Sequence, residues 1–222
     1  MRPRVTILSI LYLLTGVLFL LFENNVSFVP SFVLKMMMIP LLIILFLFNI
    51  KPAGNKFHIM MLAGLLFSWA GDVLLEVPVQ YADLFVPGLG CFLLAHIMYL
   101  LVFLTTPGEN YILRRGSFLI ILIILYGTGL IYYLYDSLGE MRIPVIVYAV
   151  VILTMLAGAV NRKNKVNPSS YVLVLAGASL FVLSDSAIAI NKFGHGFTGS
   201  SIIVMTTYLT AQYLIVTGYI RQ

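Results

Sequence analysis

Eight long apolar runs constrain the fold of this 222-residue chain more than any other feature of its sequence. Each run has about 20 residues, the length of α-helix that crosses the hydrocarbon layer of a bilayer. Their length and lack of alternation argue against the strands of a membrane barrel. We therefore predict an all-α membrane bundle, a single domain over residues 1–222, with helices near 5–22, 31–50, 57–76, 82–105, 116–135, 142–160, 170–191 and 199–220.

The composition leaves no room for a soluble domain. Charged residues make up 9% of the chain and hydrophobic residues 61%, whereas soluble domains are about 25% charged. The net charge of +5 comes from Lys and Arg in short loops, so we expect no nucleic-acid partner. The first run follows Met1-Arg2-Pro3-Arg4 but lacks a small-residue cleavage site, so we expect a retained helix. The single cysteine, Cys91, excludes an intrachain disulfide.

The loop cations predict the orientation of the bundle. With the N-terminus in the cytoplasm, ten cations fall on the cytoplasmic side and only Arg142 and Lys192 on the other. The ten are Arg2, Arg4, Lys51, Lys56, Arg114, Arg115, Arg162, Lys163, Lys165 and Arg221. We therefore expect an integral protein of a bacterial inner membrane with both termini cytoplasmic. The loops are short, so successive helices should be antiparallel neighbours.

Two aspartates lie inside the apolar runs. Asp72 and Asp185 each follow a Leu-Ala-Gly by seven residues, at 62–64 and 175–177. A charged side chain at bilayer depth costs about 2.5–3.5 kcal/mol on insertion scales. One interpretation is a packing role inside the bundle, and the other is a functional site that both aspartates share. Gly64, which precedes Asp72 by two turns, would let another helix approach the same face.

The matching aspartates suggest an internal repeat. Four predicted helices separate them, which is consistent with two parallel four-helix halves, 1–110 and 111–222. Counting back 37 residues from the two aspartates reaches Lys35 and Tyr148. Counting forward 27 reaches Tyr99 and Gln212, again polar residues in apolar runs. Chance agreement remains an alternative, because Leu and Ala are abundant in this chain.

Lys35, Asp72 and Asp185 are expected at one depth. Counting residues along each predicted helix puts all three roughly 6–9 Å below the outer boundary. An ammonium between two carboxylates can hold one protonated and one ionised, an arrangement suited to acid–base chemistry. The alternative is a buried Lys–Asp salt bridge without chemistry.

The other polar residues in the runs give weaker indications. His96 and Tyr99 lie one turn apart in the fourth run, and Tyr208 and Gln212 one turn apart in the eighth. A histidine inside a helix is more often a hydrogen-bonded core residue than a ligand. His58, His96 and His195 differ in expected depth, so we predict no metal site. A serine nucleophile at Ser184 or Ser186, on either side of Asp185, would have no histidine base nearby in the sequence.

Five short segments carry a resemblance to a known family. They are Ala70-Gly71-Asp72, the run from Gly90 through His96 to Tyr99, Leu183-Ser184-Asp185, Lys192-Phe193, and Tyr208-Leu209-Thr210-Ala211-Gln212. Their order and spacing over about residues 30–215 resemble the YhhN-type lysoplasmalogenase family. The resemblance implies an eight-helix membrane enzyme that hydrolyses the vinyl ether bond of lysoplasmalogens with paired aspartates and no metal or other cofactor.

This resemblance implies roles for the polar residues. Asp72 and Asp185 would be catalytic, one as acid and the other as base. The substrate, a lysophospholipid from the membrane, would be bound by Lys35, His96, Tyr99, Tyr148, Ser184, Lys192, Tyr208 and Gln212. A proton-coupled transporter or a lipid-binding membrane protein is the alternative, because intramembrane charges also mark ion pathways. The sequence predicts no oligomeric state.

Overall fold

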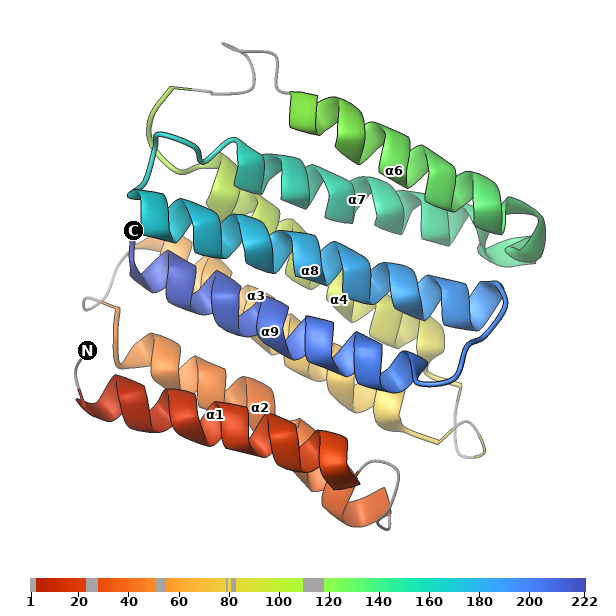
Figure 1. Ribbon diagram of the computed structural model, residues 1–222, viewed down its shortest axis with the longest axis horizontal. Helices are drawn as coiled ribbons and strands as arrows, with labels where there is room; N and C mark the ends of the chain where they lie inside the picture. Colours follow the sequence, from red (N-terminus) through yellow and green to blue (C-terminus); the bar gives the residue numbers. More distant parts are fainter. Residues whose placement is uncertain (1–2, 23–27, 51–54, 79, 81–82, 110–117) are drawn as a thin grey trace. The chain divides into compact units, whose positions relative to one another are not determined.

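The computed structural model describes residues 3–22, 28–50, 55–78, 80, 83–109 and 118–222, and all its regular elements there are helical (Figure 1). The α-helices are α1 Pro3–Phe22, α2 Phe28–Leu47, α3 Lys56–Glu76, α4 Phe85–Leu104, α6 Phe118–Leu134, α7 Arg142–Val160, α8 Pro168–Phe193 and α9 Ser200–Ile220. Two short 3-10 helices, η1 Tyr135–Ser137 and η2 Gly139–Met141, connect α6 to α7. The prediction of an all-α chain is therefore confirmed, and each α-helix overlaps one predicted run.

Among the described residues, seven helices are long and apolar enough to cross a membrane. The described side chains of α2 form a shorter apolar helix, Phe32–Leu47. Apolar side chains such as Ile124 and Leu125 are about 60% exposed, as expected where lipid replaces water. The chain is thus an integral membrane protein.

The predicted orientation rests partly on cations that the structure does not describe. Four of them lie outside the described residues: Arg2, Lys51, Arg114 and Arg115.

Residues 1–99 form one compact unit. Within it, α1 packs along α2 and α2 along α3, as the short loops predict. Glycines on α3 face aromatic rings of α4: a Cβ on Gly64 would lie 2.5 Å from Cε1 of Tyr99, and one on Gly71 2.7 Å from Phe92. The predicted close approach at Gly64 is therefore confirmed, with an aromatic side chain of α4 filling the space.

Residues 100–222 form the second compact unit, in which α8 and α9 lie side by side over most of their length (Figure 1). Two glycines bring their backbones together. A Cβ on Gly177 would lie 2.8 Å from the carbonyl oxygen of Ala211, and one on Gly218 would lie 2.8 Å from Cγ2 of Val174. The Ser170 hydroxyl also donates a hydrogen bond of 2.7 Å to the carbonyl of Gly218. This pair is the most closely packed part of the unit.

A buried arginine joins the helix ends of this unit. Arg162 follows α7 and is fully buried, with its Nη2 donating to Oγ of Ser170 at 3.2 Å and to Oε1 of Gln222 at 2.9 Å. Its guanidinium also lies 5.3 Å from the ring centroid of Phe103 in α4. Burial lowers the pKa of Arg162 to about 10, so it stays charged at neutral pH. The guanidinium therefore connects the ends of α4, α7, α8 and α9.

Because α8 and α9 approach closely at Gly177, a methyl group at this position should lower the stability of the protein. In Gly177→Ala the new Cβ meets backbone atoms, the oxygen of Ala211 and the nitrogen of Ile215 at 3.0 Å, so the helices must move apart. We expect a loss of roughly 1–3 kcal/mol of stability, measured by thermal unfolding in detergent. The control, Gly129→Ala, adds a Cβ with no atom within 4 Å, so it should be neutral or gain up to about 1 kcal/mol from helix propensity. Equal effects of the two variants would contradict the packing argument.

Candidate active site

The second unit brings together Tyr148 and Asp185, which are 37 residues apart in the sequence. Buried residues of α7 recur every three or four positions, at Val145, Tyr148 and Ile152, so this face of the helix packs inward. From there the Tyr148 hydroxyl donates a hydrogen bond to Oδ2 of Asp185 on α8. In the suggested repeat, Tyr148 corresponds to Lys35 and Asp185 corresponds to Asp72. These two residues of the second half are thus hydrogen-bonded to each other.

Asp185 and Tyr148 line a cavity of about 50 Å³ between α6, α7 and α8. The other polar groups in its wall are Tyr126 and Ser186, where the tyrosine hydroxyl donates to Oγ of the serine at 2.7 Å. Ser186 in turn donates to the carbonyl of Val182 at 2.7 Å. The remaining wall is apolar, so Asp185 provides the carboxyl group of this cavity. Tyr126 could not be predicted, because nothing in the sequence distinguishes it from the other tyrosines of the apolar runs.

A much larger groove of about 1030 Å³ lies next to this cavity, between α6 and α7; we call it the α6–α7 groove. Four residues line both spaces: Gly127, Ile131, Ala149 and Leu153. Cδ1 of Leu153 lies 2.2 Å from where a Cβ on Gly127 would be, so α6 can approach α7 there only because residue 127 has no side chain. One flexible leucine side chain therefore forms part of the partition between the groove and the cavity of Asp185.

Four other predicted residues of this unit lie outside the wall of that cavity. Ser184 is buried and donates to the carbonyl of Val204 on α9 at 3.0 Å. The Tyr208 ring packs edge-on against Phe181, with centroids 5.4 Å apart. Gln212 is fully buried on α9, and Lys192 is exposed near the end of α8. Their part in binding a substrate remains a prediction.

In the first unit, Asp72 is buried on α3 and is 4% exposed. One turn later Glu76 ends the helix and forms an ion pair with Lys35 of α2, with Nζ 2.5 Å from Oε2. The side chains of Lys35 and Glu76 are 14% and 21% exposed, so water screens this pair only partly. Glu76 was not predicted as the partner of Lys35, although its four-residue spacing from Asp72 places both acids on one face of α3.

The two predicted residues of α4 are also buried. His96 and Tyr99 are both fully inaccessible, and Tyr99 places its ring against Gly64 of α3. This contact gives Tyr99 a packing role. The predicted convergence of Asp72 and Asp185 on one site, and the binding roles of His96 and Tyr99, remain predictions.

Comparisons with known proteins identify relatives of this chain. The sequence profile of the YhhN family matches residues 31–219. A human protein named lysoplasmalogenase TMEM86B is 29% identical over 176 residues, which is 79% of this chain and 70% of the human protein. A lysoplasmalogenase of Mycobacterium bovis is 31% identical over 157 residues, or 70% of this chain and 58% of that protein. The aligned part thus spans less than two thirds of the mycobacterial protein. No solved structure matches the chain.

The ion pair between Lys35 and Glu76 predicts strong coupling between the two positions. Glu76→Gln or Lys35→Met alone leaves one charge in a largely apolar setting, and each should cost about 2 kcal/mol or more of stability. The double variant Lys35→Met/Glu76→Gln combines the same two substitutions, removes both charges and should recover most of that loss. The stabilities of the unmodified protein, the two single variants and the double variant are measured by denaturation in detergent. Glu140→Gln, at an exposed acid, is the control. Additive losses would contradict a direct pair.

Proposed function

This chain belongs to the YhhN family, and from that premise we propose that it is a membrane hydrolase of lysoplasmalogens. It would cleave their vinyl ether bond to a fatty aldehyde and a glycerophospho-alcohol. The relatives named lysoplasmalogenases support the proposal, and the family match covers residues 31–219. The aligned part spans only 58% of the mycobacterial proteins, so their activity is proposed for this chain.

The observation that carries the proposal is the position of Asp185. Its carboxylate accepts a hydrogen bond from Tyr148 in a small cavity, and four wall residues of that cavity also line the α6–α7 groove. A lipid substrate needs an apolar space for its chain and an acid–base group beside the bond that breaks. These two features adjoin each other within one unit of the chain.

The proposed reaction needs proton transfer and stabilisation of a cation. A carboxylic acid gives its proton to the β-carbon of the vinyl ether, and an oxocarbenium ion forms. A carboxylate stabilises this ion and takes a proton from the water that attacks it, as in glycoside hydrolysis. The resulting hemiacetal breaks its carbon–oxygen bond to release the aldehyde and the free hydroxyl of the glycerol. Water is the only co-reactant in this sequence.

We assign the acid and base roles to the pair Asp72 and Asp185. Tyr148 would hold Asp185 in position through its hydroxyl. Lys35, paired with Glu76, would present its ammonium to the substrate phosphate or act on Asp72 through the shared face of α3. The predicted lining of the polar end of the substrate comprises His96, Tyr99, Ser184, Lys192, Tyr208 and Gln212.

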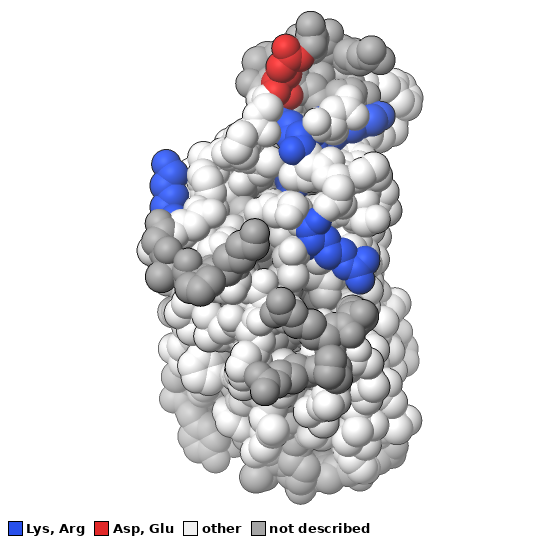
Figure 2. All heavy atoms as spheres, turned by 90° about the vertical axis from the view of Figure 1, so that its left-hand side faces the viewer, with Lys and Arg blue, Asp and Glu red and all other residues white. Residues whose placement is uncertain are grey.

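We further propose eight membrane spans in two parallel halves, 1–110 and 111–222, with both termini in the cytoplasm of a bacterial inner membrane. The ion pair between α2 and α3 and the Tyr148–Asp185 bond between α7 and α8 support a repeat, because each joins the second and third helices of a half. Figure 2 views the helix ends where α9 finishes, and Lys and Arg side chains lie on this face. The exposed cations there include Lys163 and Arg221.

Replacing either aspartate should abolish hydrolysis. Asp72→Asn and Asp185→Asn keep the side-chain size but cannot exchange the proton, so each should lower turnover by about 10²–10⁴-fold. The double variant should be little worse than either single one, because groups that act together are not additive. The measurement is aldehyde release per folded protein from a lysoplasmenylethanolamine.

Thermal unfolding of the same variants separates catalysis from folding. A packing role predicts lower melting temperatures and turnover that scales with the folded fraction. Well-folded Asn variants that keep more than about a tenth of the turnover would rule out a catalytic contribution of about 100-fold or more.

The orientation is testable with reporters fused to the C-terminus. A reporter that is active only in the cytoplasm should be active after Gln222, because the cations favour that side. A reporter that requires export should be silent at the same position and active in the loop after α8, near His195. Activity of the exported reporter at the C-terminus would overturn the proposed topology.

A further inference from the structure

We propose that the α6–α7 groove is the lysolipid site and that Asp136, with Tyr132 and Tyr133 at its η1 end, binds the ammonium of the headgroup. This inference rests on the proposed function and adds the place on the chain that holds the substrate. The η1 end then replaces the lining of the polar end that the sequence predicts, and Lys35 takes the second of its two proposed roles, at Asp72. The first part of the hydrocarbon chain then lies along the rest of the groove, beside the cavity of Asp185.

The shape of the groove suits a lipid that enters from the bilayer. Its volume of about 1030 Å³ is at the upper end for small-molecule sites, which are typically about 300–1,000 Å³. From Ile120 to Asp136 it follows 16 residues along α6 and η1, or about 24 Å at the rise of an α-helix. Most lining side chains are apolar, and Ile124 and Val150 in its wall are each about 60% exposed. A hydrocarbon chain is therefore the chemistry that this surface accepts.

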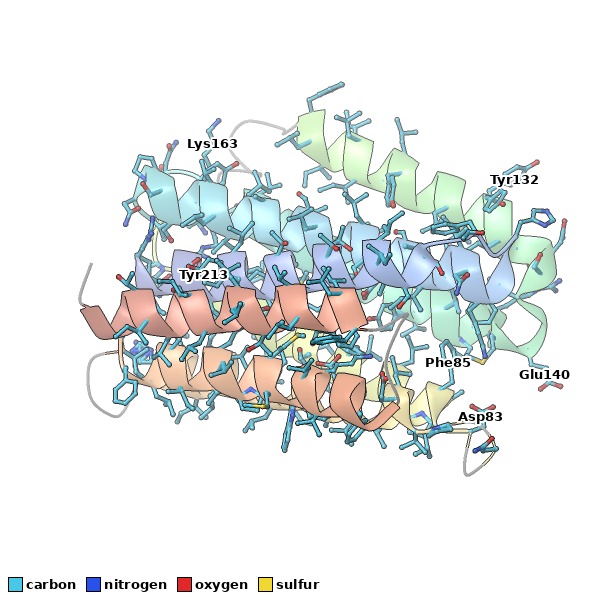
Figure 3. All side chains as sticks on the ribbon, turned by 60° about the horizontal axis from the view of Figure 1, so that its bottom comes forward. Asp83, Phe85, Tyr132, Glu140, Lys163 and Tyr213 are labelled. Carbon is cyan, nitrogen blue, oxygen red and sulfur yellow. The ribbon has the colours of Figure 1, made fainter. Side chains whose placement is uncertain are left out.

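Polar groups gather at one end of the groove only. Asp136 lines it together with the exposed Tyr132, Tyr133 and Tyr135, and Figure 3 shows Tyr132 at the η1 end of α6. Aromatic rings and a carboxylate are the groups that bind an organic ammonium, through cation–π attraction and charge. The threonines Thr128 and Thr154 are the remaining polar side chains of the wall, and both are uncharged. The single carboxylate of the groove thus marks where a cationic headgroup fits.

Arg142 completes the charge pattern at this end. Its guanidinium lies 4.6 Å from the ring centroid of Tyr135, and its Nε donates to the carbonyl of that residue at 3.2 Å. These contacts hold the η1 turn and place a positive charge on the tyrosine next to Asp136. In a headgroup with a phosphate and an ammonium, the negative phosphate would face Arg142 and the positive ammonium would face Asp136. The η1 end of the groove is therefore complementary to a zwitterion.

The spacing of the two sites agrees with the length of the substrate. The cavity of Asp185 meets the groove at Gly127 and Ile131, which precede Asp136 by nine and five residues, or roughly 8–14 Å of helix. Nine bonds separate the vinyl ether oxygen from the nitrogen of the ethanolamine headgroup, about 11 Å when extended. An ammonium at Asp136 thus places the vinyl ether level with the partition at Leu153. A rotation of that side chain would bring the bond to the carboxylate.

Removing the charge of Asp136 tests the headgroup site. Asp136→Asn should raise KM about tenfold for a lysoplasmenylethanolamine, a change typical of one lost charge-assisted contact, and leave kcat unchanged. It should not raise KM for the matching 1-alkenyl-glycero-3-phosphate, which has no ammonium. The control, Glu140→Gln, removes an exposed acid outside the groove lining and should behave as the unmodified protein. Equal KM changes for both substrates, or none for either, would overturn the assignment.

Blocking the far end of the groove tests the path of the chain. Ala157 lines that end on α7, so Ala157→Trp should raise KM for a hexadecenyl substrate and leave that of a hexenyl substrate unchanged. Val172→Trp, at an exposed position on α8 outside the groove, is the matched control. If chain length has no influence on the effect of Ala157→Trp, the chain does not lie in this groove.

Binding of a stable analogue separates this inference from the proposed reaction. A 1-alkyl lysophosphatidylethanolamine lacks the vinyl ether, so its Kd, measured by calorimetry in detergent, depends on the groove alone. A Kd raised about tenfold by Asp136→Asn supports the headgroup site even if the protein hydrolyses no vinyl ether. Hydrolysis by the unmodified protein together with an unchanged Kd in Asp136→Asn would overturn the headgroup site and leave the proposed function standing.

Discussion

The structure depends on how few polar groups it places in an apolar layer and on how it pairs them. Water is scarce at that depth, so an ionisable side chain must find its partner on a neighbouring helix. Lys35 finds Glu76 across α2 and α3, and Asp185 accepts a hydrogen bond from Tyr148 across α7 and α8. The two interactions differ in kind. The first pairs a cation with an anion, whereas in the second a neutral hydroxyl donates to the carboxyl group of Asp185.

Helix packing decides where a bound molecule can be. Gly177 and Gly218 bring α8 and α9 to backbone contact, so no space is left between them. Between α6 and α7, by contrast, the close contact at Gly127 is with the end of the Leu153 side chain, and the helices leave about 1030 Å³ open beside it. The second unit thus has one helix interface that two glycines close, between α8 and α9, and one that stays partly open, between α6 and α7.

Hydropathy predicts the helices well because burial in lipid dominates their free energy, and the ends of α7 agree with the predicted 142–160 run. The offset of 37 residues drew attention to Tyr148 as the counterpart of Lys35, but the hydrogen bond between Tyr148 and Asp185 was not predicted. The partner of Lys35 was missed, because charge and depth alone do not distinguish Asp72 from an acid one turn away. The α6–α7 groove could not be predicted, since it depends on the contact of Leu153 with Gly127 across two helices and not on any local pattern.

The geometry also suits the different solubilities of the proposed products. A vinyl ether held at Leu153 would have its chain against lipid-exposed residues such as Ile124 and its headgroup among the exposed tyrosines near Asp136. Hydrolysis cuts the molecule between these two regions. The aldehyde keeps the hydrocarbon chain, so it gains about 0.8 kcal/mol per buried CH₂ by staying in the bilayer. The glycerophospho-alcohol loses that anchor and partitions into water from the polar end. Each product therefore leaves from the end of the groove whose surroundings solvate it, and neither has to pass through the bundle.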